Sequence, residues 1–185
     1  MSGPAEISAV QLNRLIGTPE APIVVDICID EDFALNPLLV PGSFRHSHKD
    51  LDGLIDRIAS DGGKSKRVVV VCQKGMKLSQ GVAAILRARG IAAEALTGGQ
   101  LAWCAAGMMT RNGVLDLPIN GQGSTRWVTR HRPKIDRLAC PWLIRRFVDL
   151  GAEFLFVPPR DVEMVAEKFA AQPFDIDAPN QRFSH

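Results

Sequence analysis

The feature that most constrains the fold is a run of β-branched residues that leads directly into a cysteine. Arg67 is followed by four valines at 68–71, and Cys72 comes next. A short apolar run without alternation is typical of a strand buried on both faces. Residues 78–89 then have helical spacing, and Gly90 stands where a C-terminal glycine cap is expected. Cys72 is therefore expected in a loop between a buried strand and a helix.

The rest of the N-terminal half repeats this order of strand and helix. Residues 22–27 and 91–96 are further short apolar runs. Helical patterns occur at 8–17, where Ser8 and Gln11 suggest a capping box, and at 47–60 and 101–106. This alternation predicts βαβ units and an α/β domain with a mainly parallel sheet flanked by helices. Ligands of such folds bind beyond the carboxyl ends of the strands, where Cys72 is expected.

The sequence also predicts a second, smaller domain. Residues 113–125 are rich in Gly, Pro, Asn and Ser, which is typical of a linker. We therefore expect a domain at 1–112, the linker at 113–125, and a small α+β segment at 126–185. A segment of roughly 60 residues forms only a marginal core by itself, so this one is interpreted as incomplete.

Charge, hydropathy and cysteine usage argue against several classes of protein. The net charge is only +2, so neither nucleic acid nor a membrane surface is indicated as a partner of the whole chain. No apolar run reaches the roughly 18 residues that cross a bilayer, and residues 1–8 do not resemble a signal peptide, so a cytoplasmic protein is expected. The four cysteines are widely spaced, which favours free thiols, and no metal or cofactor is predicted.

The setting of Cys72 favours a reactive thiolate. Backbone N–H groups and the dipole at the start of the next helix would both stabilise negative charge on the sulfur. Lys74 and Lys77 add positive charge, which also attracts an anionic sulfur donor. Gly75 would let the backbone fold around the sulfur. The alternative is a buried structural cysteine, which is the commoner role of a free thiol.

The stretch VVVVCQKGMKLS at 68–79 resembles the active-site loop of the rhodanese family. Further matches in the right order are Val25-Asp26, similar to the family's second strand with its acid, the turn at 40–43, and LTGGQLAW at 96–103, similar to its GGxxxW segment. The resemblance covers nearly all of residues 5–112. It implies a rhodanese-like fold and sulfurtransferase activity.

The resemblance also assigns roles within a six-residue loop. It implies that Cys72 takes a sulfane sulfur from a small donor such as thiosulfate, holds it as a persulfide, and passes it to a thiol or cyanide acceptor. The residues implied in substrate binding are Gln73, Lys74, Gly75, Met76 and Lys77.

The length of this loop argues against a phosphatase or an arsenate reductase. Phosphatases of similar fold place an arginine six residues after the cysteine, because a tetrahedral phosphate needs a wider loop and a bidentate clamp. Leu78 occupies that position here. A loop that ends at Lys77 fits a sulfur atom better than a phosphate.

Two departures from the rhodanese pattern surround the loop. The family usually has an arginine two residues after the acid of the second strand, and this chain has Cys28 there, so an ion pair that steadies the site is expected to be missing. Gln73 and Leu78 replace a common arginine and a common hydroxyl residue, so donor preference could differ. Asp26 could orient donors in the loop or cap the local structure. Cys28 could pack in the core, or it could act as a resolving thiol that forms a disulfide or polysulfide with Cys72.

Residues 126–159 resemble the start of the C-terminal domain of ChrB-type chromate-resistance proteins. The pattern predicts strands at 127–128 and 153–157 with a helix at 135–148 between them. The residues expected near the start of this helix are His131, Arg132, Asp136, Arg137 and Cys140.

This C-terminal cluster has three interpretations. Arg132, Arg137 and Cys140 could bind an oxyanion such as chromate and reduce or sense it. A solvated basic face with local ion pairs explains the same residues equally well. Nucleic-acid binding has less support, because no known DNA-reading motif accompanies the basic residues. The function expected for the whole chain is sulfur transfer linked to chromate resistance, and the alternative is a chromate-responsive regulator whose rhodanese-like domain is a binding module.

Overall fold

The chain divides into two compact units, Met1–Val114 and Leu115–His185, in the computed structural model. The structure describes residues 5–61, 66–114, 117, 119–120, 124–132 and 134–176. Among these residues, no helix combines the length and the apolar character needed to cross a bilayer.

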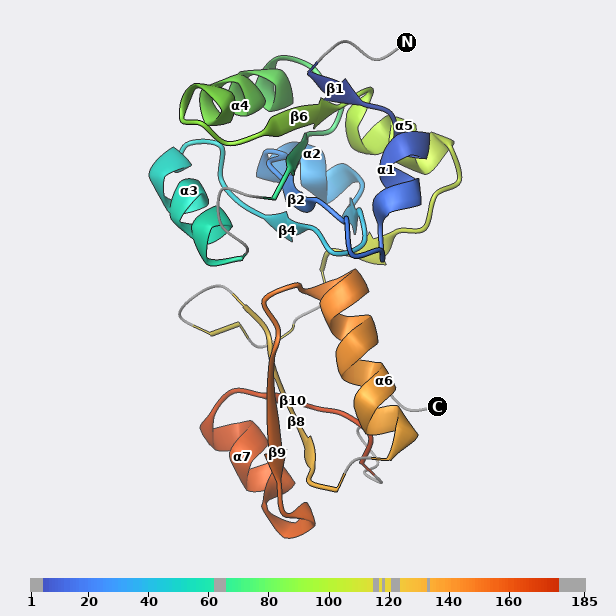
Figure 1. Cartoon of the computed structure of the whole chain (residues 1–185), viewed down its shortest axis with the longest axis vertical. Coiled ribbons are helices and arrows are strands. Elements are labelled where there is room, and N and C mark those ends of the chain that lie inside the picture. The colour runs from blue at the N-terminus through green and yellow to red at the C-terminus, as the bar shows by residue number, and fades with distance from the viewer. Residues whose placement is uncertain are drawn as a thin grey trace. The chain divides into compact units, whose positions relative to one another are not determined.

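The N-terminal unit is built on a five-stranded parallel sheet (Figure 1). In spatial order the strands are β1 (Glu6–Ile7), β6 (Ala93–Leu96), β5 (Val68–Val71), β2 (Ile23–Asp26) and β4 (Phe44–Arg45). A separate antiparallel pair joins β3 (Leu38–Leu39) to β7 (Arg111–Asn112). The mainly parallel α/β fold expected from the sequence is confirmed.

Helices cover both faces of this sheet. Helices α1 (Ala9–Leu15) and α5 (Gly99–Ala105) pack on one face, and α3 (Leu51–Ser60) and α4 (Lys77–Ala88) pack on the other (Figure 1). The four valines of β5 alternate between the two faces and are at most 1% exposed. Full burial of each contributes about 1.5–3 kcal/mol, which explains why this run forms the central strand.

One helix follows β2 without having been predicted. Helix α2 (Asp30–Leu35) buries only Phe33, so it has too little apolar periodicity to be recognised. Its first turn carries Asp30, Glu31 and Asp32, which interact favourably with the helix dipole.

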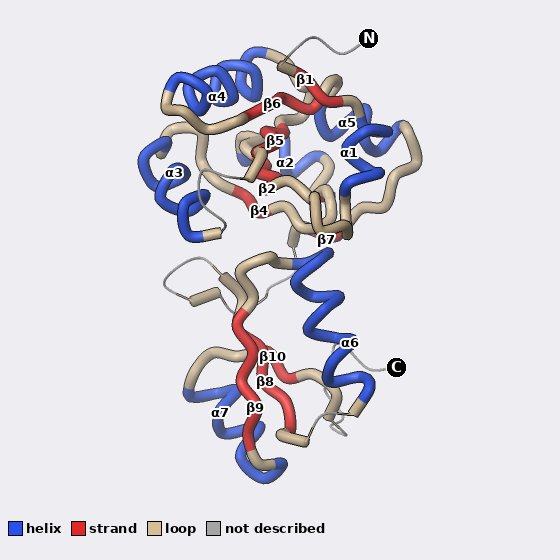
Figure 2. Tube along the Cα trace, viewed as in Figure 1, coloured by secondary structure: helices blue, strands red, loops and turns tan. Residues whose placement is uncertain are grey.

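The C-terminal unit contains a three-stranded sheet in the order β10 (Gln172–Pro173), β8 (Arg126–Arg130) and β9 (Glu153–Val157). Helix α6 (Ile135–Leu143), continued by the π-helix Ile144–Val148, covers one face, and α7 (Val162–Lys168) covers the other (Figure 2). All strand pairs are parallel. This unit is therefore an α/β unit, whereas an α+β segment was expected, because α6 and α7 each connect parallel strands.

The predicted helix at 135–148 changes its hydrogen-bonding pattern near its middle. Pro141 lies inside α6 and has no backbone N–H to donate to the carbonyl of Arg137, and the π-helix begins at Ile144. The predicted linker at 113–125 is only partly described, since residues 115, 116, 118 and 121–123 lie outside the described part. Leu117 is buried in the core of the second unit beside Trp127.

Candidate active site around Cys72

Cys72 lies at the point where the order of the sheet reverses. It is the first residue after β5, and β2 runs beside β5 with Asp26 opposite Val71. After β2, the next strand of the sheet is β4, which pairs with the outer side of β2. After β5, the next strand is β6, which pairs with β5 on the opposite side of the sheet. Such a switch point is where parallel α/β folds bind ligands. The Cys72 side chain is 7% exposed.

Two glycine segments hold the loop that follows Cys72. Gly75 has φ +65° and Gly99 has φ +60°, a region that L side chains rarely adopt. A Cβ atom on Gly75 would overlap the carbonyl of Leu96, and one on Gly99 would overlap the carbonyl of Cys72. The backbone N–H of Gln100 donates to the Cys72 carbonyl at 3.0 Å. The GGxxxW-like segment therefore supports the loop from beneath.

The backbone N–H groups of the loop have no acceptor within the described part of the chain. From Gln73 to Ser79, no backbone N–H donates a hydrogen bond to any residue that the structure describes, and Gln80 is the first to do so, to Met76 at 3.0 Å. Helix α4 also has no side-chain cap. Unpaired N–H groups at a helix N-terminus form a favourable environment for an anion.

Ser79 supplies a hydroxyl to Cys72, one residue after the position where the rhodanese pattern commonly has one. The Cys72 thiol donates to Ser79 Oγ at 3.2 Å, and this hydroxyl donates to the Met76 carbonyl at 3.3 Å. The residue after Leu78 therefore gives the site a hydroxyl, although Leu78 itself has none. Side chains in a helix point back towards its N-terminus, so the third residue of α4 reaches Cys72.

A cavity of about 380 Å³ opens above Cys72. It is lined by Cys28, Ile29, Asp32, Cys72, Gln73, Lys74, Met76, Lys77 and Leu78. Lys74, Met76 and Lys77 are exposed, so two cationic side chains border its entrance. Gln73 donates from Nε2 to the Asp32 carbonyl at 3.4 Å, which joins the loop to α2. Of the six predicted loop residues, only Gly75 does not line this cavity.

The ion pair that Cys28 was expected to remove is present, because another residue supplies it. Arg45 is opposite Asp26 in the pairing of β2 with β4, and its Nε lies 3.8 Å from Asp26 Oδ1. Arg45 also donates from Nη2 to Asp30 Oδ1 and to the Cys28 carbonyl, both at 2.9 Å. Its guanidinium stacks over the Phe33 ring at 3.9 Å.

Asp26 and Cys28 form a buried pair next to Cys72. The backbone N–H of Cys28 donates to Asp26 Oδ1 at 3.0 Å, and its thiol donates to Oδ2 at 3.6 Å. Burial raises the pKa of Asp26, which the Cys28 N–H and Arg45 only partly oppose. Burial, then the Asp26 charge, raise the pKa of Cys28 well above its usual range. The Cys28 thiol therefore stays protonated at neutral pH.

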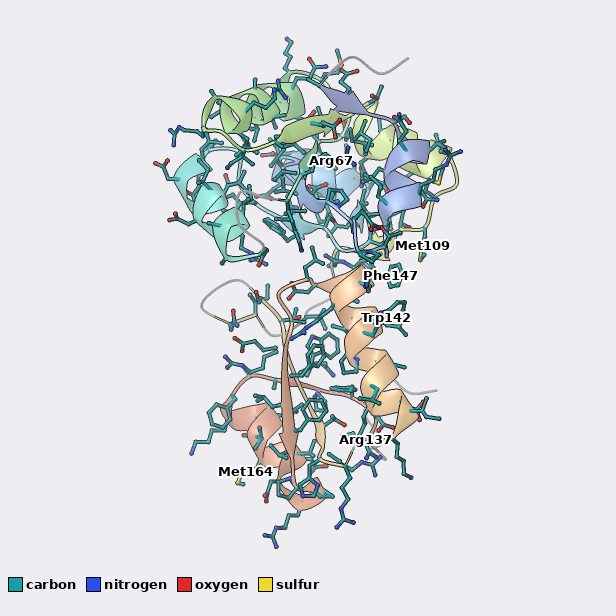
Figure 3. All side chains as sticks on the ribbon, viewed as in Figure 1. Arg67, Met109, Arg137, Trp142, Phe147 and Met164 are labelled. Carbon is teal, nitrogen blue, oxygen red and sulfur yellow. The ribbon has the colours of Figure 1, made fainter. Side chains whose placement is uncertain are left out.

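In the C-terminal unit, the structure uses Arg137 in an internal ion pair. Arg137 is 5% exposed, and its Nε donates to Asp175 Oδ2 at 2.7 Å while Nη1 bonds the Arg132 carbonyl. Burial, then Asp175 and Asp136, raise the pKa of Cys140. Figure 3 shows Arg137 near the start of α6. An oxyanion would have to compete with Asp175 for this guanidinium, and the Arg132 side chain is exposed.

Comparison with known proteins divides the chain in the same way. The family model for a rhodanese-like domain matches residues 8–106, and the model for the ChrB C-terminal domain matches 127–185. The chain is 43% identical over 60 residues to Protein ChrB from Cupriavidus metallidurans. That alignment covers 32% of this chain and only 17% of the length of its relative.

Solved structures resemble the chain at lower identity. A thiosulfate sulfurtransferase from Pseudomonas aeruginosa is 22% identical with a TM-score of 0.50, over 79% of this chain and 27% of that one. A rhodanese-like domain protein from Staphylococcus aureus is 27% identical with a TM-score of 0.43, over 53% of this chain and 89% of that one. The first of these likenesses supports the fold. With its rhodanese-like domain at 8–106, the chain belongs to the rhodanese-like domain family.

Proposed function

We propose that the N-terminal unit is a sulfurtransferase whose nucleophile is Cys72. The Cys72 thiolate attacks the outer sulfur of a donor such as thiosulfate, and sulfite leaves with the electron pair of the broken S–S bond. Cys72 then holds the sulfur as a persulfide. A thiol or cyanide acceptor attacks the outer sulfur and releases the Cys72 thiolate, which completes the cycle.

The observation that carries this proposal is that Cys72 lines the cavity and is followed by a loop whose backbone N–H groups have no acceptor among the described residues. A persulfide is anionic, and each hydrogen bond to a charged group contributes about 1.5–3 kcal/mol. The N–H groups from Gln73 to Ser79 meet no acceptor among the described residues, so they are available to the outer sulfur. The Ser79 hydroxyl can also rotate to donate to a Cys72 thiolate.

The lining of the cavity suits a small anionic donor. Lys74 and Lys77 border its entrance and attract a dianion such as thiosulfate. Gln73 is fixed by its bond to the Asp32 carbonyl and can present its amide to the donor's oxygens. We therefore assign donor binding to Gln73, Lys74, Met76 and Lys77, and support of the loop to Gly75.

Thiocyanate formation from thiosulfate and cyanide tests this proposal. The wild-type chain should form thiocyanate, and Cys72→Ser should form none above the uncatalysed reaction. Cys104→Ser is the matched control, because Cys104 lies on α5, outside the cavity, with Asn36 Nδ2 3.8 Å from its sulfur. Equal rates in the wild type and Cys72→Ser would remove Cys72 as the nucleophile.

The match to the ChrB C-terminal domain favours a second candidate, a chromate-responsive regulator in which the rhodanese-like domain is a binding module. In this proposal Arg132, Arg137 and Cys140 recognise chromate in the C-terminal unit. Binding of the chain to a DNA fragment would be measured with and without chromate. A chromate-dependent change that persists in Cys72→Ser would support regulation, and its absence at all chromate concentrations would oppose it.

A further inference from the structure

We propose that Cys28 resolves the Cys72 persulfide by attacking Cys72 Sγ, which forms a Cys28–Cys72 disulfide and releases sulfide. This inference rests on the proposed function, because it requires sulfur on Cys72. It adds a second outcome for the bound sulfur, in which the sulfur leaves as sulfide when no acceptor enters the cavity.

The pairing of the strands brings Cys28 and Cys72 close to each other. Asp26 lies opposite Val71, and the N–H of Ile27 donates to the Val71 carbonyl at 2.8 Å. Cys72 is one residue beyond this pair and Cys28 is two beyond it. Paired strands lie about 4.8 Å apart, so the residues that follow two paired strand ends start within the Cα range of disulfides, about 4.4–6.8 Å. The two thiols are close enough for the charge of Cys72 to raise the pKa of Cys28.

Both sulfur atoms also lie on the same side of the sheet. Cys28 and Cys72 belong to one hydrophobic cluster, together with Val25 and Val70. Both line the cavity of about 380 Å³, and no other cysteine does so among the described residues. A persulfide on Cys72 therefore shares this cavity with one further thiol.

The chemistry balances without an external oxidant. The sulfur of Cys28 forms a bond to Cys72 Sγ, the bond between Cys72 and its outer sulfur breaks, and that sulfur leaves with the electron pair as hydrosulfide. The Cys28 thiol proton passes to Asp26 Oδ2, which lies 3.6 Å from Cys28 Sγ, and from there to the departing sulfur, so that an anionic persulfide leaves as hydrosulfide. Two thiol equivalents from a monothiol or dithiol reductant then restore both cysteines.

Charges around Cys28 make this resolution slower than transfer to a small acceptor. Burial and Asp26 raise the pKa of Cys28, whereas Arg45 opposes that effect from the neighbouring strand. Lys74, Lys77 and Asp32 face the same cavity from the loop and from α2. Because the attacking species is the thiolate, the rate of sulfide release should rise steadily with pH above neutrality.

Loading the protein with thiosulfate in the absence of cyanide tests the inference. The wild type should release sulfide once, in an amount equal to the protein, and its intact mass should fall by two hydrogen atoms. Peptide mapping without reductant should find residues 28 and 72 cross-linked. Cys28→Ser should instead gain the mass of one sulfur atom and release no sulfide, and Cys104→Ser should match the wild type.

The outcomes separate this inference from the proposed function. A wild type that keeps one added sulfur, without a cross-link or sulfide, overturns the role of Cys28 and leaves Cys72 as the nucleophile. A wild type that neither gains sulfur, releases sulfide nor forms the cross-link overturns both. If Cys28→Ser takes up no sulfur, Cys28→Ala replaces it, and the cross-link in the wild type still decides the matter.

Discussion

Replacing Gly75 by alanine should disrupt the candidate site, because the loop approaches the segment beneath it too closely for a side chain. Gly75 has φ +65°, and a left-handed backbone costs an L residue about 1–2 kcal/mol. The new Cβ would also overlap the Leu96 carbonyl and the backbone N–H groups of Gly98 and Gly99. Such overpacking costs about 1–3 kcal/mol. We therefore expect Gly75→Ala to lose about 2–5 kcal/mol of the free energy of unfolding.

Gly90→Ala is the control that separates strain from overlap. Gly90 has φ +80°, but no described atom lies within 4 Å of the Cβ it would gain. This variant should lose only the backbone cost of about 1–2 kcal/mol. Urea denaturation measures both losses, and with a slope of about 2 kcal/mol per M the Gly75→Ala midpoint should fall by about 1–2.5 M.

Activity provides the second measurement. The overlapped atoms are backbone, so the loop must move, and a displacement of about 1 Å at a reacting group can cost about 100-fold in rate. Thiocyanate formation should fall by about that factor in Gly75→Ala and stay at the wild-type level in Gly90→Ala. Equal stability losses in the two variants, together with full activity in Gly75→Ala, would refute this reasoning.

Three further perturbations test other parts of the structure. Ser79→Ala removes the hydroxyl 3.2 Å from Cys72 and should slow thiocyanate formation by about 5–30-fold, with little change in the apparent affinity for thiosulfate. Because burial raises the pKa of Asp26 in the folded state, the folded chain binds more protons at this group than the unfolded chain does. The contribution of Asp26 to the free energy of unfolding should therefore decrease as pH rises from the usual carboxyl pKa to the raised one. Urea denaturation at several pH values should show this decrease in the wild type and not in Asp26→Asn. Arg137→Met removes the 2.7 Å partner of Asp175 and leaves it Arg130, whose Nη2 is 3.9 Å from Oδ2, so the C-terminal unit should lose about 1–3 kcal/mol of stability, which thermal unfolding would detect; an unchanged transition would contradict the ion pair.

The parts of the fold that the sequence predicted are those with strong local signals. The buried strand at 68–71, the helix that follows it and the capping box at Ser8 and Gln11 are all present, because each depends on residues close together in the chain. The two-residue strands β1, β3, β4, β7 and β10 were missed, since two residues carry no periodicity. The cytoplasmic location stays a prediction.

Around Cys72, the residues that sequence reasoning missed are those positioned by tertiary structure. Ser79 reaches Cys72 because side chains in α4 point back towards the start of the helix. Matching the sequence to the rhodanese pattern residue by residue does not take this direction into account. Arg45 lies far from Asp26 in the chain, and only the register of β4 against β2 brings them together. A predicted register for the segment at 44–45 could have found this pair.

The position of Arg45 also explains how the chain tolerates a thiol at residue 28. Asp26 is 2% exposed, and a buried carboxylate without a cation is strongly unfavourable. In the rhodanese pattern the arginine two residues further along would meet this need, and here Arg45 meets it from the neighbouring strand, 3.8 Å from Asp26 Oδ1. Residue 28 is therefore released from an electrostatic role and can be a cysteine. Because the end of β2 borders the Cys72 cavity, a cysteine at residue 28 adds a second sulfur atom to the site. The buried carboxylate of Asp26 keeps Arg45 as its cationic partner.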